Sequence, residues 1–258
     1  MNPRATKADV KYLRFLTTTK GRDEARKFLL EGWRPLVDAL KSDFSVEAVY
    51  YTKAAERNLK NIEAILHDRK IPLREMTESD LDRVTATEQA QGIIAILRQI
   101  HISPERACAH ANLVIALERV NNPGNVGTVI RTADWFGADA VLLNDLCASL
   151  YNEKVIRSTA GSIFHLPIAE RVDLAAAINS LRARGFAVWG TDSQGTNIGE
   201  VNFTDKLLLI FGSEGAGLTQ ELRAACDGVL AIPPFGRAES LNVATAASAI
   251  LSFYRLTK

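Results

Sequence analysis

The sequence of 258 residues is poor in cysteine and contains no run of about 18 apolar residues. The three cysteines, Cys108, Cys147 and Cys226, are odd in number and scattered, and no Cys-x-x-Cys pair occurs. This pattern supports neither a disulfide framework nor a zinc site, so we expect no metal. The N-terminus is polar and lacks the apolar core of a signal peptide, so we expect a cytoplasmic protein with no membrane segment.

An excess of charge of one sign is also absent, since the net charge is only +1. Total charge alone therefore does not indicate a nucleic-acid partner. The N-terminal 34 residues differ, because they hold nine basic and four acidic side chains. Such a basic stretch is able to follow a phosphate backbone. A solvated helical face explains the same pattern equally well, and the charges alone leave both interpretations open.

Composition and periodicity indicate an α/β protein with two domains. Hydrophobic residues make up 47% and charged residues 24% of the chain, as in ordinary globular proteins. Residues 1–100 predict a small α/β domain. We expect helices at 10–16, 22–41, 54–69 and 78–84, and strands at 46–51 and 92–97. The stretch that follows is polar and contains Pro104, so we assign residues 101–111 to a linker.

Residues 112–258 show a stronger alternation of strands and helices. Apolar runs predict strands at 113–117, 140–143, 186–190, 207–211 and 228–232. Helices are expected between them, at 126–136, 152–159, 172–184 and 219–225, with a last helix at 242–256. Continuous apolar strands that alternate with helices predict a mostly parallel sheet covered on both faces.

Three short blocks of this second domain contain the candidate functional residues. They span residues 121–131, 207–218 and 232–243, and each has a glycine- or proline-bearing turn beside a buried strand or a helix start. At such turns, backbone polar groups are free to contact a ligand. In the first block Asn125 is a plausible N-cap, and Ser240 or Asn242 is one in the third.

The second block does not match the common nucleotide-binding loops. It contains Gly212, Gly215 and Gly217 after a buried strand, but neither a Gly-Lys-Ser/Thr ending nor a Gly-x-Gly-x-x-Gly pattern. Glu214 lies inside the loop, where its charge would repel a phosphate. These features argue against a nucleotide-dependent α/β enzyme. Taken alone, such a loop is more often only a tight connection.

In their order, spacing and residue types, the three blocks resemble the SpoU (TrmH-like) family of RNA ribose 2'-O-methyltransferases, within the SPOUT superfamily. The family's Asn-x-Gly-x-x-x-Arg core is matched by Asn125, Gly127 and Arg131. The chain departs from the family where Pro234 replaces the usual methionine, and where Thr159 replaces a serine. The resemblance is specific over residues 112–258 and looser before them.

The resemblance implies more about the fold than periodicity does. It implies a C-terminal SPOUT domain with a deep trefoil knot, although chains are generally unknotted. It also implies a homodimer with the active site at the subunit interface. Residues 1–100 would form an RNA substrate-binding domain similar to small ribosomal proteins. The opening of that domain is matched from Phe28 to Trp33.

The resemblance further implies the site residues. S-adenosylmethionine would be bound mainly by the backbone, at Thr191, Gly212, Ile232 and Leu241. The catalytic group would consist of Arg131, with Asn125, Glu214, Ser240 and Asn242 orienting the reactants. Arginine is a poor base by its reference pKa, so proton removal and phosphate positioning both remain open for Arg131. RNA contacts are expected at Arg14, Lys20, Arg22 and Arg157.

The function that follows is methyl transfer from S-adenosylmethionine to a ribose 2'-hydroxyl in RNA. The N-terminal domain favours ribosomal RNA of the large subunit over transfer RNA as the substrate. Single-stranded or looped RNA is favoured, because the hydroxyl must be presented in an open conformation. The alternatives are a transfer RNA 2'-O-methyltransferase and a non-catalytic RNA-binding or ribosome-assembly protein that kept the fold.

Overall fold

The computed structural model describes residues 2–85 and 91–258, and the chain divides into two compact units. The first unit comprises residues 1–100 and 151–164, and the second comprises residues 101–150 and 165–258. A short segment from the second half of the sequence thus groups with the first unit. Among the described residues, no helix has the length and apolar character needed to span a membrane.

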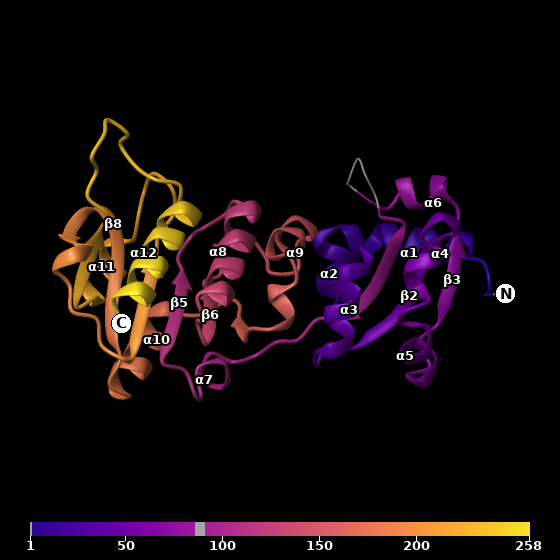
Figure 1. The fold of residues 1–258 in the computed structure, drawn as a ribbon, viewed down its shortest axis with the longest axis horizontal. Helices are drawn as coiled ribbons and strands as arrows, with labels where there is room; N and C mark the ends of the chain where they lie inside the picture. Colours follow the sequence, from indigo (N-terminus) through magenta and orange to yellow (C-terminus); the bar gives the residue numbers. More distant parts are fainter. Residues whose placement is uncertain (1, 86–90) are drawn as a thin grey trace. The chain divides into compact units, whose positions relative to one another are not determined.

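The first unit is built on a four-stranded sheet with the strand order β1–β4–β2–β3 (Figure 1). Strand β4 runs antiparallel to β1 and β2, and β2 runs parallel to β3. The strands are β1 (Lys27–Glu31), β2 (Val46–Thr52), β3 (Leu73–Met76) and β4 (Ile93–Arg98). The helices are α1 (Lys7–Thr17), α2 (Thr19–Ala25), α3 (Trp33–Lys41), α4 (Glu56–Leu59), α5 (Glu63–Asp68), α6 (Glu78–Asp82) and α9 (Glu153–Thr159), with 3-10 turns η1 (Lys53–Ala55) and η2 (Ser162–Phe164).

The single helix expected over residues 22–41 is wrong in its middle, where strand β1 lies. Arg26 adopts a left-handed conformation with φ of 51° and ends α2, and Gly32 with φ of 98° separates β1 from α3. Between them Phe28 and Leu30 are buried, and the strand pairs with β4 along its full length. Tertiary pairing therefore overrides the helical spacing of the apolar side chains.

Aromatic and aliphatic side chains fill the core of the first unit. Val10, Leu13 and Leu16 of α1 pack against one face of the sheet, at Tyr50 and Ile94. The ring of Phe28, which is fully buried, lies 6.0 Å from the ring of Phe44 and 4.8 Å from that of Tyr151, between centroids. The last contact joins the segment 151–164 to the first unit.

The second unit is built on a six-stranded sheet in which all strands are parallel, with the order β10–β8–β9–β5–β6–β7. The strands are β5 (Leu113–Leu117), β6 (Ala140–Leu143), β7 (Ile168–Ala169), β8 (Ala187–Asn197), β9 (Leu207–Phe211) and β10 (Gly228–Ala231). The helices are α7 (Pro104–Ala107), α8 (Pro123–Trp135), α10 (Leu174–Ala183), α11 (Gln220–Ala225) and α12 (Val243–Thr257), with a 3-10 turn η3 (Ile198–Glu200). The predicted α/β fold with a mostly parallel sheet is confirmed. Strand β7 was not expected, because it is only two residues long.

Helices cover both faces of this sheet, which explains the continuous apolar strands. On one face α7, α10 and α11 pack against alternate strand residues such as Val114 and Leu208. Helices α8 and α12 lie side by side, joined by a hydrogen bond between the Thr132 and Ser248 hydroxyls (Figure 1). Strands β5 and β9 are in register, with Leu117 opposite Phe211, so the first block and the glycine loop of the second block follow their strands at the same edge of the sheet.

Because Phe28 is fully buried, we expect Phe28→Ala to lower the free energy of unfolding of the first unit by about 3–5 kcal/mol. The same substitution at Phe235, which is 99% exposed, should change stability by less than about 0.5 kcal/mol. Urea denaturation measures both. Equal effects of the two substitutions would contradict this account of the core.

Candidate functional site

The first block places Asn125 on a helix rather than at its cap. Helix α8 begins at Pro123, and the Asn122 side-chain oxygen accepts hydrogen bonds from the backbone N–H groups of Gly124 (2.9 Å) and Asn125 (3.4 Å). The interpretation of Asn125 as N-cap was therefore wrong by three residues. Proline suits the first helical position, because it has no N–H to leave unpaired there. With Asn122 as the cap, the Asn125 side chain is available for other contacts.

The second block folds back sharply after strand β9. The backbones of Ser213 and Gly217 exchange two hydrogen bonds of 2.9 and 3.2 Å. A Cβ atom at Gly212 would lie 2.3 Å from the Gly217 carbonyl carbon, so only glycine fits there. The resulting narrow loop places Glu214 near its tip, with the side chain exposed.

The third block connects strand β10 to helix α12. Asn242 is the N-cap of α12, and its side-chain oxygen accepts from the backbone N–H groups of Ala244 (2.9 Å) and Thr245 (3.3 Å). Of the two cap residues considered from the sequence, the structure thus selects Asn242. The cap fixes the side-chain oxygen and directs the amide nitrogen of Asn242 away from the helix.

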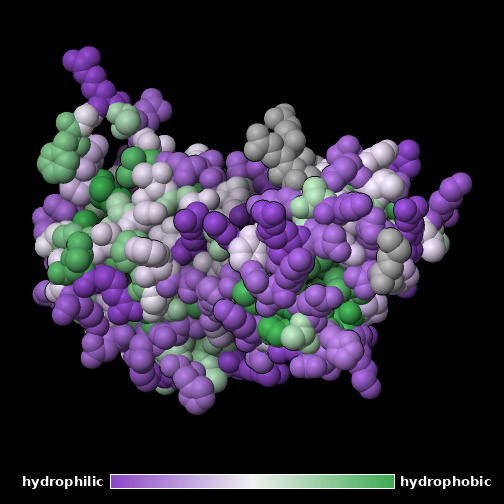
Figure 2. Space-filling model, turned by 45° about the vertical axis from the view of Figure 1, so that its right-hand side comes forward, coloured by the Kyte–Doolittle hydropathy of each residue, from purple (hydrophilic) through white to green (hydrophobic). Residues whose placement is uncertain are grey.

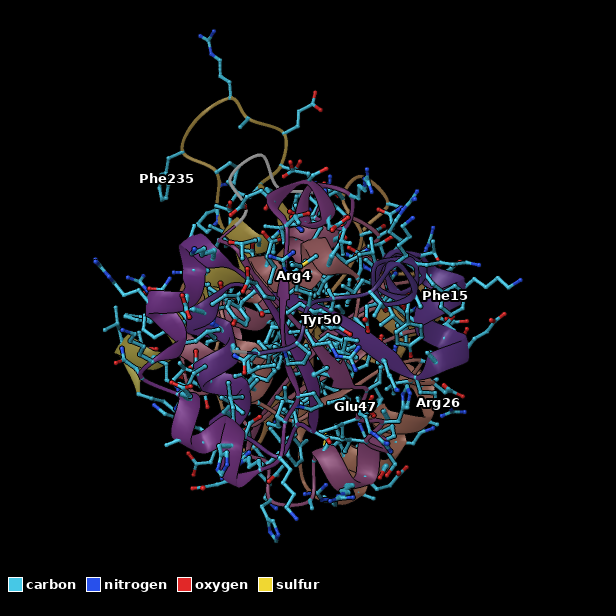
Figure 3. All side chains as sticks on the ribbon, turned by 90° about the vertical axis from the view of Figure 1, so that its right-hand side faces the viewer. Arg4, Phe15, Arg26, Glu47, Tyr50 and Phe235 are labelled. Atoms are coloured by element: carbon cyan, nitrogen blue, oxygen red, sulfur yellow. The ribbon has the colours of Figure 1, made fainter. Side chains whose placement is uncertain are left out.

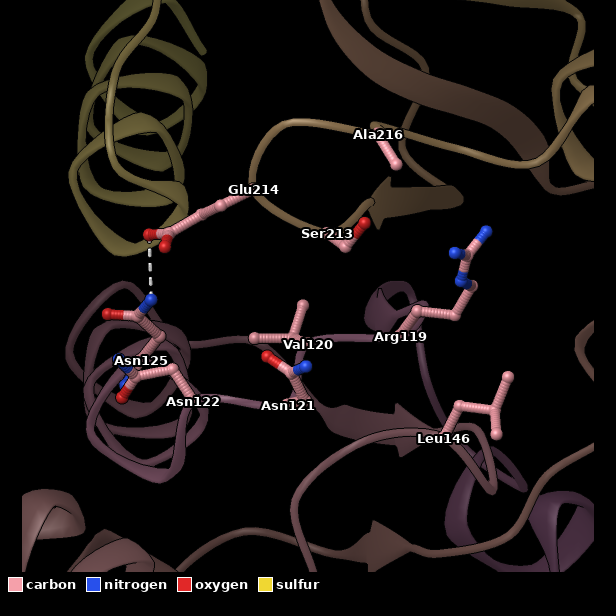
Figure 4. A pocket seen from close by; sticks show the side chains of 9 residues that line it. All are labelled: Arg119, Val120, Asn121, Asn122, Asn125, Leu146, Ser213, Glu214 and Ala216. Carbon is pink, nitrogen blue, oxygen red and sulfur yellow. Dashed lines mark hydrogen bonds between the residues drawn. The ribbon is translucent and has the colours of Figure 1, made fainter.

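Side chains from all three blocks meet in one cluster, which we call the Asn125–Glu214–Asn242 cluster. The amide nitrogens of Asn125 and Asn242 both donate to Oε1 of Glu214, at 2.7 and 2.5 Å. The amide nitrogen of Asn242 also lies 3.1 Å from Oδ1 of Asn125. Figure 4 shows the bond between Glu214 and Asn125 across the mouth of the site. Three of the five residues predicted to be catalytic are therefore brought together.

The other two predicted catalytic residues lie outside the cluster. Arg131 is on the exposed face of α8, and its side chain makes no hydrogen bond or ion pair within the described part of the chain. Ser240 is exposed in the segment that leads into α12. That segment projects from the second unit (Figure 2), and it carries Phe235, which is 99% exposed (Figure 3).

The residues predicted to bind S-adenosylmethionine come from strand β8, from the end of β9 and from the segment between β10 and α12. Gly212 is buried, and the Thr191 hydroxyl donates to the Ile210 carbonyl oxygen at 3.1 Å. Ile232 is half-buried just after β10, and Leu241 is 48% exposed. The narrow loop that Gly212 permits carries the exposed carboxylate of Glu214 near its tip, and this charge suits a ligand with a positive sulfonium. The residues present therefore fit this cofactor.

The residues predicted to bind RNA differ in their exposure. Arg14, Lys20 and Arg157 are exposed on the first unit. Arg22 is only 4% exposed, and its guanidinium donates to the Thr17 carbonyl oxygen at 2.7 Å and to the Thr19 hydroxyl at 3.1 Å. These bonds connect α1 and α2, so we withdraw Arg22 from the candidate RNA contacts.

A cavity of about 490 Å³ lies beside the cluster, at the carboxyl ends of β5 and β9 (Figure 4). Its volume falls in the range of about 300–1,000 Å³ that is usual for small-molecule sites. None of the four predicted cofactor residues lines it. The lining residues are Arg119, Val120, Asn121, Asn122, Asn125, Leu146, Ser213, Glu214 and Ala216.

Two acidic residues that support the site were missed by sequence reasoning. Glu118 follows strand β5 and is only 3% exposed, and its Oε2 accepts from the backbone N–H of Thr219 at 2.8 Å. It thereby fixes the end of the second block to the strand that leads into the first. A charged residue directly after five apolar strand residues was the signal available in the sequence.

The second acidic residue is Asp192, which follows Thr191 in strand β8 and lies beside Gly217 of the second block. Burial by itself would raise the pKa of this carboxyl group. Hydrogen bonds from the Gln194 backbone and from the Arg223 guanidinium, together with the charge of Arg223, outweigh burial and hold the pKa of Asp192 below its usual value. The carboxylate is therefore ionised at neutral pH and anchors α11 against β8.

The close approach of the Gly217 backbone to Gly212 leads to a testable prediction. Gly212→Ala should lower the free energy of unfolding by about 1–3 kcal/mol, because the new Cβ overlaps the Gly217 backbone. S-adenosylmethionine should also bind more weakly, since the loop has to shift. Gly236→Ala is the matched control, because a Cβ there meets nothing within 4 Å. Thermal unfolding and calorimetry test both, and a Gly212→Ala protein that behaves like wild type would refute the packing argument.

Comparison with known proteins agrees with this geometry. The sequence model of the SpoU rRNA Methylase family matches residues 112–252, and that of the MRM3-like substrate binding domain matches residues 7–95. The 23S rRNA (guanosine(2553)-2'-O)-methyltransferase RlmP of Bacillus subtilis is 37% identical over 247 residues, which is 95% of each chain.

Solved structures share the architecture of the whole chain. The AdoMet-bound rRNA methyltransferase from Sinorhizobium meliloti superposes with a TM-score of 0.88 at 30% identity, covering 99% of this chain and 97% of that one. The SpoU methyltransferase AviRb from Streptomyces viridochromogenes, in complex with AdoMet, gives 0.85 at 27% identity and covers 98% of both chains. The family model, the relatives and the arrangement of the three blocks agree, and the chain belongs to the SpoU rRNA methylase family.

Proposed function

We propose that this protein transfers the methyl group of S-adenosylmethionine to a ribose 2'-hydroxyl of large-subunit ribosomal RNA. The observation that supports this most directly is the Asn125–Glu214–Asn242 cluster, which joins three separate sequence blocks at one edge of a parallel sheet. Ligands of open parallel sheets bind at the carboxyl ends of the strands. The cluster lies where such a ligand is expected.

The relatives support both the chemistry and the substrate class. The Bacillus subtilis relative is named for 2'-O-methylation of a guanosine in 23S rRNA, and two of the similar structures were solved with AdoMet. Transfer RNA is the second candidate, because several relatives that are 30–31% identical are described only as tRNA/rRNA methyltransferases. Methyl transfer to transfer RNA but not to ribosomal RNA would favour that candidate.

S-adenosylmethionine supplies a methyl group already activated by a sulfonium, which leaves as a neutral thioether. The protein therefore has to hold the donor, orient the acceptor and help remove one proton. The backbone around Gly212, together with Thr191, Ile232 and Leu241, would hold the donor. As the ribose oxygen bonds to the methyl carbon, the carbon–sulfur bond breaks and the hydroxyl proton leaves.

Arg131 and the Asn125–Glu214–Asn242 cluster would orient the acceptor and help to remove its proton. The cluster presents one fixed carboxylate, because two amide groups bind the same oxygen of Glu214 and leave Oε2 without a partner in the described part of the chain. It would orient the acceptor hydroxyl, together with Ser240 from the segment that leads into α12. Arg131 would contact the neighbouring phosphate or promote loss of the proton.

A second copy of the chain would complete the site. Thr128, Arg131 and Trp135 are the exposed residues along α8, at spacings of three and four, so they share one face. Trp135 is 83% exposed, and so is Leu256 on the neighbouring helix α12. Large apolar side chains on two packed helices are typical of a subunit interface. A homodimer formed through this face would bury Arg131 at the interface.

The remaining parts of the proposal concern the fold and the first unit. The deep trefoil knot implied by the resemblance would lie in the segment that contains the second and third blocks. Residues 1–100 would bind the RNA, with Arg14 and Lys20 near the phosphates and Arg157 from the segment 151–164 beside them. Residues 101–111 would be the linker, and residues 112–258 would catalyse. A ribosomal RNA substrate agrees with a cytoplasmic location.

Substitution of Arg131 tests the reaction. Arg131→Ala should reduce transfer of labelled methyl from S-adenosylmethionine to ribosomal RNA about 10- to 100-fold, because charge-assisted contacts are worth about 1.5–3 kcal/mol. Cofactor affinity by calorimetry should stay unchanged. Arg106→Ala, an exposed arginine on α7, is the control. Wild-type turnover by Arg131→Ala would remove this residue from the mechanism, and failure of the wild type to bind S-adenosylmethionine would favour a non-catalytic RNA-binding protein.

The dimer is tested separately. Trp135→Glu places a charge in the proposed interface and should convert the protein to monomers in sedimentation experiments, with loss of methyl transfer. Ile65→Glu, at an exposed apolar position of the first unit, should leave the mass unchanged. A wild-type protein that is already monomeric at micromolar concentration would contradict the proposed interface.

A further inference from the structure

The cavity beside the cluster has two chemically different ends. At one end are the carboxylate of Glu214 and the amide of Asn125, and at the other are Arg119 and Leu146 (Figure 4). Arg119 is half-buried, and its guanidinium forms no hydrogen bond or ion pair with any residue that the structure describes. A guanidinium that lines a cavity and lacks a carboxylate partner is suited to bind an anion.

The backbone of Arg119 is held in an unusual conformation. Its φ of 57° is left-handed, which costs about 1 kcal/mol or more for a residue other than glycine. The Arg119 N–H donates to Oδ1 of Asn144 at 3.0 Å, and the neighbouring Val120 carbonyl accepts from the Ala148 N–H at 2.9 Å. These bonds join the loop after β5 to the loop after β6 and fix the direction in which the Arg119 side chain leaves the backbone.

The loop after β6 supplies an apolar surface to the same cavity. Leu146 is 59% exposed and lines the cavity next to Arg119. The thiol of the following residue, Cys147, lies 3.2 Å from the Leu117 carbonyl oxygen and 3.3 Å from Asn144 Oδ1, and its one hydrogen is shared between these two acceptors. Burial raises the pKa of Cys147 to about 11, so the thiol keeps its proton and remains the donor. Leu146 is therefore exposed on a rigid loop.

The cavity contains a group suited to each chemical part of a nucleotide in RNA. Oxygen and amide groups at the Glu214 end suit a ribose hydroxyl, the Leu146 side chain suits the face of a base, and the guanidinium suits a phosphodiester. The predicted cofactor residues do not line this cavity, so the acceptor and the donor do not compete for it.

We propose that this cavity binds the acceptor nucleotide, with Arg119 on the phosphodiester beside the target ribose and Leu146 against its base. The proposal rests on the function proposed above, and it adds the residues that position the acceptor. Arg119 is thus a substrate-binding residue. Its role and its position differ from those of Arg131, which lies on the exposed face of α8.

The test compares Arg119→Gly with wild type on an unmodified transcript of large-subunit ribosomal RNA. Glycine removes the guanidinium and tolerates the left-handed backbone, so the variant should fold. We expect kcat/KM for the RNA to fall about 10- to 100-fold, as for loss of a hydrogen-bonded charge. Affinity for S-adenosylmethionine should be unchanged. Arg119→Lys should recover part of the activity, and Arg106→Ala should match wild type.

A salt titration distinguishes loss of a phosphate contact from a structural effect. The slope of log Kd for the RNA against log salt concentration should decrease by about 0.7 in Arg119→Gly, as expected for one contact to a single strand. The slope should keep its wild-type value in Arg119→Lys. It should also keep that value in Leu146→Ser, although the affinity for RNA should fall there because the apolar contact is lost.

Several results would overturn the proposal. The first is an Arg119→Gly protein with the kcat/KM and the salt slope of wild type. The second is an Arg119→Gly protein that loses both S-adenosylmethionine binding and RNA methylation, because that result would show a structural role for Arg119. In both cases wild type and Arg106→Ala would still methylate the RNA, so the proposed function would stand. If wild type methylates no RNA, the proposed function fails and the acceptor site fails with it.

Discussion

The site depends on one constraint, the in-register parallel pairing of strands β5 and β9. Leu117 lies opposite Phe211, so the chain leaves both strands at the same edge of the sheet. Glu118 reinforces the pairing, because its backbone N–H donates to the Phe211 carbonyl at 2.9 Å and its buried carboxylate binds the Thr219 N–H. Without this register Asn125 and Glu214, which are 89 residues apart in sequence, would not meet.

Because of this register, the side chains of the Asn125–Glu214–Asn242 cluster are held in fixed positions beside one another. Each of its members is fixed by backbone geometry before the side chains meet: Asn125 by the start of α8, Glu214 by the narrow glycine loop, and Asn242 by its own cap on α12. Side chains positioned in this way lose little entropy when a ligand binds, which is what a reaction dependent on orientation requires.

Sequence reasoning predicted the parts of the structure that local patterns determine. The apolar runs predicted five of the six strands of the second unit, all except β7, and the glycines and prolines of the three blocks predicted the loops around the site. It was wrong for strand β1, whose side chains fit a helix and whose backbone pairs with a strand more than 60 residues away. It also placed Arg22 at the RNA surface, because charge patterns do not show which guanidinium is buried.

The contacts around the cavity could not be predicted from the sequence, for a different reason. The left-handed backbone of Arg119 and the exposure of Leu146 depend on how the loops after β5 and β6 bind each other through Asn144. No motif marks these residues, and their significance follows only from the space that they line.

The central claim is that the loops at this edge form a site for RNA ribose methylation. Mapping of 2'-O-methylated riboses in RNA from cells with and without this protein tests it most directly. We expect that one ribose methyl group in large-subunit ribosomal RNA disappears without the protein, and that it returns with the wild-type chain but not with a Glu214→Ala chain. Identical methylation maps in the two kinds of cell would contradict the account.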